Sequence, residues 1–127
     1  MDKIPPFSVI NRIKSFFFAG KGVAKMLIYE HNAWIHFAAT IIVVSAGFHF
    51  RINRYDWCAL ALAIVAVWTA EALNTALELL CDVAVPDIHP LINQAKDVAA
   101  GAVLITAIGA VIIGALVFWP YVAVYFI

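Results

Sequence analysis

Charged side chains are scarce in this sequence. Of its 127 residues only 13% are charged and 65% are apolar, far outside the range of ordinary soluble domains. The formal net charge at pH 7 is zero and there is no long basic run, so no nucleic-acid partner is expected. A soluble protein would need three helices buried on all sides, which so short a chain cannot cover. The composition therefore indicates a membrane protein.

Cysteine and familiar catalytic motifs are also scarce. The two cysteines, Cys58 and Cys81, would lie about 34 Å apart on one helix, so they cannot pair within a chain and are interpreted as small apolar residues. The N-terminal segment lacks a sustained apolar core before a small-residue cleavage site, so we expect no cleavable signal peptide. No segment matches G-x-x-x-x-G-K-[ST], and no Ser-His or Cys-His spacing stands out. The absence of the G-x-x-x-x-G-K-[ST] motif excludes a Walker-type nucleotide site.

Long apolar runs are what the sequence has in quantity. Residues 33–50, 57–80 and 98–119 are within or close to the ~17 to 25 residues that a spanning helix needs. Residues 7–29 alternate basic and apolar side chains, which is typical of a helix in the membrane interface; a cytoplasmic lead-in without membrane contact is the alternative. We predict an all-α membrane protein, with residues 1–127 as one domain: an N-terminal amphipathic interfacial helix and three transmembrane helices in a helical bundle. Because so small a core cannot bury its polar faces alone, we expect a homo-oligomer.

Basic side chains are concentrated before the first run, where the sequence has Lys3, Arg12, Lys14, Lys21 and Lys25. Arg51 and Arg54 follow that run, and Lys96 alone lies between the second and the third. The positive-inside bias then predicts a cytoplasmic N-terminus. With three spans, the 51–56 loop and the C-terminus lie outside, and the 83–96 loop returns to the cytoplasmic side.

Four polar side chains gather near the end of the second run: Glu71, Asn74, Glu78 and Asp82. At 100° per residue they lie at about 0°, 300°, 340° and 20°, a stripe about 80° wide on one side of a helix. A carboxylate at membrane depth costs several kcal/mol, so the stripe must face protein, water or metal. Asp82 could be a solvated cap, and Glu78 is only one turn deeper. Glu71, two turns further in, resists that explanation and marks a functional candidate.

These carboxylates repel one another unless protons or a hard cation intervene, and oxygen ligands are those that Mg²⁺ prefers. Glu30, just before the first run and on the same predicted side, could supply another carboxylate. Lys96 and Asp97 fall at the start of the third span. An isolated lysine there is usually a snorkelling anchor, but beside carboxylates and a helix N-terminus it can hold phosphate oxygens. The pattern therefore indicates a metal-phosphate site.

Two segments resemble the prokaryotic diacylglycerol kinase family. They are "EALNTALELLCD" and "HPLINQAKDVAAGAVL", which carry the patterns E-x-x-N-[ST]-A-x-E-x-x-x-D and A-K-D-x-x-A-x-A-V-L. With "GKGVAKMLIYE" the resemblance extends over residues 12–118. Members of this family are small integral-membrane kinases with three spans and an amphipathic N-terminal helix.

The resemblance implies an ATP-dependent lipid kinase that uses Mg²⁺ to transfer the γ-phosphoryl group to the hydroxyl of a membrane lipid. It implies a homotrimer with active sites shared between subunits, in the bacterial cytoplasmic (inner) membrane. By position it implies Glu71 as the general base and Glu30 and Glu78 as ligands of Mg²⁺. It further implies nucleotide-binding candidates, which are Lys96, Asn74, Asp82, His89 and Asp97.

Two lipid acceptors stay open within the family, undecaprenol and diacylglycerol. The stretch "EHNAWIHFAA" resembles the E-R-N-x-R-I-H stretch of undecaprenol-type members through Glu30, Asn32, Ile35 and His36. It departs from that stretch at His31 and Trp34, where arginine is common. We favour undecaprenol as the acceptor, with diacylglycerol as the alternative.

Two functions outside lipid kinases fit the sequence less well. A small proton or cation pathway subunit would need polar residues through the full membrane depth, yet residues 57–67 have none. A purely structural oligomeric span would not explain why Lys96 and Asp97 join the same side. His36 and His49, which flank the first run, are interpreted as satisfied interfacial histidines.

Overall fold

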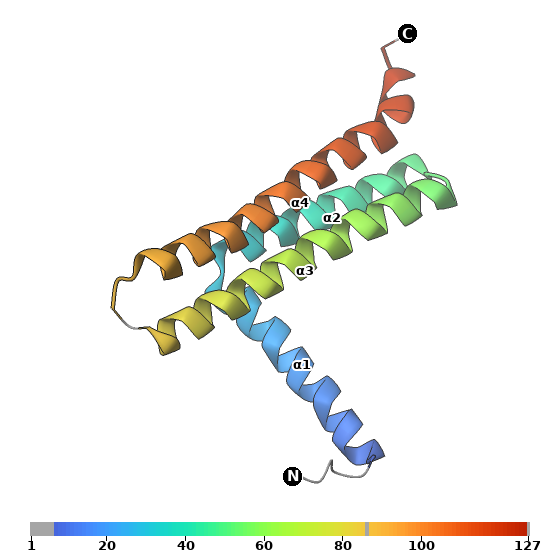
Figure 1. The fold of residues 1–127 in the computed structure, drawn as a ribbon. Coiled ribbons are helices and arrows are strands. Elements are labelled where there is room, and N and C mark those ends of the chain that lie inside the picture. Colours follow the sequence, from blue (N-terminus) through green and yellow to red (C-terminus); the bar gives the residue numbers. More distant parts are fainter. Residues whose placement is uncertain (1–6, 86, 127) are drawn as a thin grey trace.

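Four helices make up the chain in a computed structural model that describes residues 7–85 and 87–126. They are α1 (Val9–Tyr29), α2 (His31–Phe50), α3 (Arg54–Ala84) and α4 (Pro90–Ala123). The last three are long and apolar enough to cross a membrane. In Figure 1, α2, α3 and α4 lie side by side while α1 projects away from them. The predicted all-α membrane fold is confirmed.

The spanning helices bury little apolar surface in each other. α3 packs most extensively along α4 and less extensively against α2. One apolar cluster forms near the α2–α3 turn, around the buried side chains of Ile52, Leu60 and Val117. Large side chains elsewhere on α4, such as Ile105 and Val111, stay exposed. An apolar surface of that extent needs lipid or another chain to cover it.

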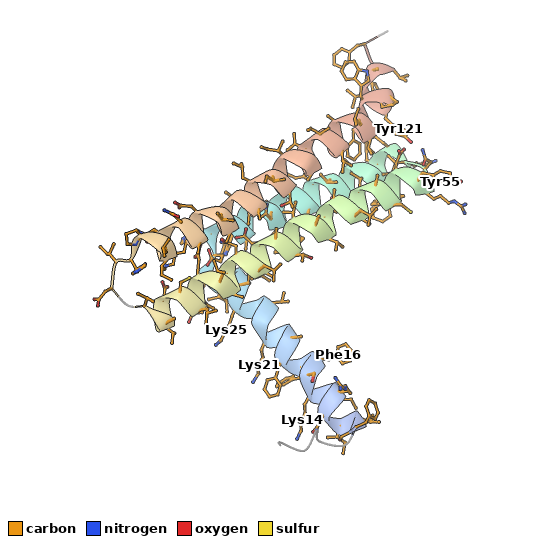
Figure 2. The ribbon with its side chains drawn as sticks, in the orientation of Figure 1. Lys14, Phe16, Lys21, Lys25, Tyr55 and Tyr121 are labelled. Atoms are coloured by element: carbon orange, nitrogen blue, oxygen red, sulfur yellow. The ribbon has the colours of Figure 1, made fainter. Side chains whose placement is uncertain are left out.

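The turn between α2 and α3 is fixed by its polar residues. Arg51 adopts the left-handed conformation (φ 51°, ψ 48°) that ends a helix, and its N–H donates to the carbonyls of the last turn of α2. Asn53 Oδ1 accepts from the backbone N–H groups of Tyr55 (2.8 Å) and Asp56 (3.0 Å), which caps α3. Tyr121 of α4 donates to Asp56 Oδ2 (2.8 Å). Figure 2 shows Tyr55 and Tyr121 at this end of the bundle.

α1 exposes both basic and large apolar side chains. Figure 2 shows Lys14, Lys21 and Lys25 on one side of the helix and Phe16 on the other. Phe16 is 80% exposed, so the apolar side has no protein cover within the described chain. A helix with one basic and one uncovered apolar side is suited to lie in the membrane interface.

The break between α1 and α2 occurs at a single residue. Glu30 has an extended backbone (φ −102°, ψ 112°), and its N–H donates to the Met26 carbonyl (3.0 Å). The indole Nε1 of Trp34 donates to the Leu27 carbonyl (2.7 Å), which ties the first turn of α2 to the last turn of α1. These bonds set the direction in which α1 leaves the bundle and place Glu30 at the corner.

Candidate active site

Glu71 is the largest fully buried side chain of the described residues, with 0% of it exposed. Neither of its carboxylate oxygens has a hydrogen-bond partner in the described chain. Thr75 does donate to Glu71, but to its backbone carbonyl (2.9 Å). A buried carboxylate without partners costs several kcal/mol of stability. Groups retained at such cost are concentrated at functional sites.

The length of α3 sets the depth of Glu71 in the membrane. The helix has 31 residues, or about 46 Å at 1.5 Å per residue, whereas the hydrocarbon core is only ~30 Å thick. If the core begins near Trp57, beside the α2–α3 turn, it ends about 20 residues later, near residue 77. Glu71 then lies about 9 Å inside the far edge of the core, and Glu78 and Asp82 lie in the headgroup region.

His36 of α2 faces Glu71 across the interface between α2 and α3. Its Nε2 atom is 3.5 Å from Glu71 Oε2, and its side chain is 16% exposed. That separation is longer than an ordinary hydrogen bond. The interpretation of His36 from the sequence, as a histidine at the membrane interface, missed its contact with Glu71. The contact depends on how α2 is rotated against α3, which the sequence does not show. The only signal in the sequence was the position of His36 in the resembling stretch.

Asn74 and Glu78 continue the stripe toward the predicted cytoplasmic end. Asn74 is buried, and its Nδ2 donates to Glu78 Oε1 (3.0 Å). Its own Oδ1 is buried without a partner in the part of the chain described. Glu78 is half-buried. The solvent exposure of the carboxylates therefore increases along the stripe, from the buried Glu71 to the half-buried Glu78.

The stripe ends at a contact between α3 and α4. Lys96 Nζ donates to Asp82 Oδ1, and both side chains are partly accessible. Asp97 is exposed on the same turn of α4. His89 is also exposed, and its Nδ1 accepts from the N–H of Leu91 (3.3 Å), so it caps α4. Lys96 thus joins the stripe through Asp82, while His89 lies at the edge of the loop.

Glu30 belongs to the same group of charges. Burial raises the pKa of its carboxyl, the carboxylates of Glu78 and Glu71 raise it further, and His31 opposes them. The described residues contain no group of three or more His, Cys, Asp or Glu side chains able to hold a metal ion. Mg²⁺ is commonly held by one or two carboxylates together with substrate phosphates. Glu30 and Glu78 fit that kind of site better than a permanent metal centre.

Apolar hollows lie between α3 and α4 and at the corner between α1 and α2. One of about 440 Å³ is lined by small and apolar residues of α3 and α4, with Asn74 as its amide. Another of about 240 Å³ lies at the corner between α1 and α2, lined by Leu27, Trp34 and Phe37. Asn74 of the stripe thus lines a hollow that suits hydrocarbon.

Residues 17–118 match the family model of prokaryotic diacylglycerol kinase. The chain belongs to the prokaryotic diacylglycerol kinase family. The matched region of the chain contains every predicted site residue, from Glu30 to Asp97. Membership makes it a lipid kinase, a phosphotransferase whose acceptor is an alcohol.

Three relatives carry two different names. Undecaprenol kinase of Bacillus subtilis (strain 168) is 38% identical over 121 residues, which is 94% of this chain and 98% of that protein. Diacylglycerol kinase of Synechocystis sp. is 38% identical over 111 residues, 87% of this chain and 63% of that protein. Diacylglycerol kinase of Escherichia coli (strain K12) is 28% identical over 109 residues, 86% and 89% of the two chains.

Proposed function

We propose that this family member phosphorylates undecaprenol, using ATP as donor, at the cytoplasmic face of the bacterial inner membrane. The observation that carries the proposal is the buried carboxylate of Glu71, without a hydrogen-bond partner in the described chain, in a helix long enough to span the membrane. The choice of acceptor is supported by the relative named undecaprenol kinase, which matches over 98% of its length. Diacylglycerol is the second candidate, since two other relatives bear that name.

Glu71 is the general base in this proposal. It accepts the proton of the lipid hydroxyl as the hydroxyl oxygen attacks the γ-phosphorus, and ADP leaves from the opposite side. A lipid hydroxyl lies near the boundary between headgroups and hydrocarbon, and a hydrocarbon core that begins near Trp57 would have Glu71 about 9 Å inside that boundary. The hydrogen-bonding capacity of its carboxylate is free for this proton, since neither oxygen is engaged within the described residues.

Glu30 and Glu78 would hold Mg²⁺ on the triphosphate, where the ion neutralises phosphate charge. Asn74 keeps Glu78 in place through its 3.0 Å hydrogen bond. Lys96, positioned by Asp82, contacts a phosphate oxygen as a point charge. His89 and Asp97, exposed at the end of the stripe, complete the proposed set of nucleotide contacts.

The proposed assembly is a homotrimer with shared active sites and a cytoplasmic N-terminus. The exposed apolar side chains of α2, α3 and α4 support contact with further chains or lipid. The basic side of α1 supports a position at the anionic cytoplasmic surface.

A conduit for protons or cations is less well supported. Among the described residues the buried polar side chains are Glu71, Asn74 and Thr75, which lie in one half of α3. The other end of the bundle is closed by the apolar cluster around Leu60. A polar region that stops at half the membrane depth suits a site that opens to one side.

The test is phosphorylation by the purified protein in mixed micelles with γ-labelled ATP and Mg²⁺. Undecaprenol and diacylglycerol are offered separately, and the labelled lipid is separated and counted. We expect label on undecaprenol at the higher kcat/KM. Glu71→Gln should lose label transfer. Its control variant is Asp87→Asn, which makes the same carboxylate-to-amide change on an exposed residue outside the stripe and should keep the wild-type rate. A preference for diacylglycerol would correct the acceptor, and no label on either lipid would contradict the proposal.

A further inference from the structure

Two contacts one helical turn apart connect α2 to α3 beside Glu71. The first joins His36 Nε2 to Glu71 Oε2 at 3.5 Å. In the second, Trp68 Nε1 donates to Thr40 Oγ1 at 3.1 Å. His36 and Thr40 are four residues apart on α2, and Trp68 and Glu71 are three apart on α3, so each pair lies on one helix face. The two contacts therefore hold the same faces of the two helices together.

The residues of the second contact also adjoin the histidine of the first. Thr40 Oγ1 donates to the His36 carbonyl (2.7 Å) while it accepts from Trp68. The indole of Trp68 meets the imidazole of His36 edge to face, with ring centroids 6.5 Å apart and an interplanar angle of 70°. Trp68, held by Thr40, thus lies against the imidazole whose Nε2 faces Glu71.

Resting on the proposed role of Glu71 as general base, we propose that His36 is a positioning residue that holds the Glu71 carboxylate through Nε2–H. His36 is the one basic side chain of the described residues that contacts Glu71. When this donor closes to hydrogen-bond distance of Oε2 in the reactive complex, Oε1 is left to accept the proton of the lipid hydroxyl. Catalytic hydrogen bonds are often long without substrate and shorten in the reactive complex, which fits the 3.5 Å separation.

The role requires a donor at one place in the side chain. A neutral imidazole that donates from Nε2 carries its proton there and leaves Nδ1 as an acceptor. A glutamine amide nitrogen reaches nearly as far as Nε2, whereas an asparagine amide nitrogen lies nearer the backbone, like Nδ1. A merely space-filling role for His36 would not distinguish between these two amides.

The experiment compares His36→Gln, His36→Asn and His36→Leu with wild type. For every protein, kcat and the KM for MgATP are measured in micelles that contain undecaprenol or diacylglycerol. We expect Asn and Leu to lower kcat about 10- to 100-fold with little change in the KM for MgATP, and Gln to keep most of the wild-type kcat. The matched control is His49→Leu, an exposed histidine at the other end of the same helix, which should leave both constants unchanged.

The results separate a failure of the positioning role from a failure of the proposed function. An active wild type whose kcat survives His36→Leu overturns the positioning role alone. Equal losses in the Gln, Asn and Leu variants, with lowered thermal stability, overturn it in favour of simple packing. A wild type that phosphorylates neither lipid overturns the proposed function and this role together.

Discussion

Replacing Glu71 by glutamine should change activity and stability in opposite directions. The substitution keeps the shape of the side chain, so it opens no cavity, and it removes a carboxylate that is 0% exposed and has no hydrogen-bond partner in the described chain. Loss of a general base lowers the rate of transfer about 10²- to 10⁴-fold. The same loss relieves the fold of a buried charge.

The size of the stabilisation follows from two costs. An uncompensated buried charge costs several kcal/mol, and a buried amide without partners costs about 1–3 kcal/mol. The difference predicts that Glu71→Gln raises the free energy of unfolding by about 1–3 kcal/mol. Glu78→Gln is the matched control, because Glu78 is half-buried and accepts from Asn74; its change should be smaller.

Unfolding by SDS in mixed micelles, followed by near-UV circular dichroism, measures both variants against wild type. A higher midpoint for Glu71→Gln together with lost phosphoryl transfer is the expected result. A lower midpoint would refute the reasoning. It would mean that His36 and Glu71 form a stabilising ion pair in spite of the 3.5 Å separation, because breaking a buried pair costs about 3–5 kcal/mol.

Three further predictions concern the turn, the nucleotide and the metal. Gly47→Ala should destabilise the fold by about 1–3 kcal/mol, because the new Cβ would lie 2.6 Å from Cη2 of Trp57. Unfolding in SDS measures the change, with Gly101→Ala as the control because a Cβ there meets open space. Equal stability of the two variants would contradict the prediction. Lys96→Met should raise the KM for ATP more than it lowers kcat, because it removes the ammonium group that pairs with Asp82 and is proposed to contact phosphate. An unchanged KM for ATP in steady-state assays would show that Lys96 does not contact the nucleotide. Chelation with EDTA should abolish transfer without loss of helix content by circular dichroism, and transfer that persists would exclude a Mg²⁺ requirement.

The apolar runs and the polar stripe could be predicted from the sequence because both depend on one helix at a time. Hydrophobic length identifies the part of a helix inside the membrane, but the helix itself continues into the interface. α4 therefore begins at Pro90, where His89 supplies the cap and proline occupies the first turn, and not near residue 98, where the apolar run starts.

Contacts between helices could not be predicted in the same way. The His36–Glu71 contact depends on the rotation of α2 against α3, and the Lys96–Asp82 contact on the register of α4 against α3. A single sequence carries neither quantity. The corner at Glu30 likewise depends on the bond from Trp34 to the end of α1, which no local pattern at Glu30 indicates.

The central claim is that the carboxylate of Glu71 takes the proton when ATP phosphorylates a membrane lipid alcohol. The most direct measurement is the initial rate of label transfer from γ-labelled ATP to undecaprenol by wild type and Glu71→Gln, with MgATP binding to each measured in parallel. The account predicts transfer by wild type, a rate about 10²- to 10⁴-fold lower for the variant, and equal nucleotide binding. Wild-type turnover in Glu71→Gln would contradict it.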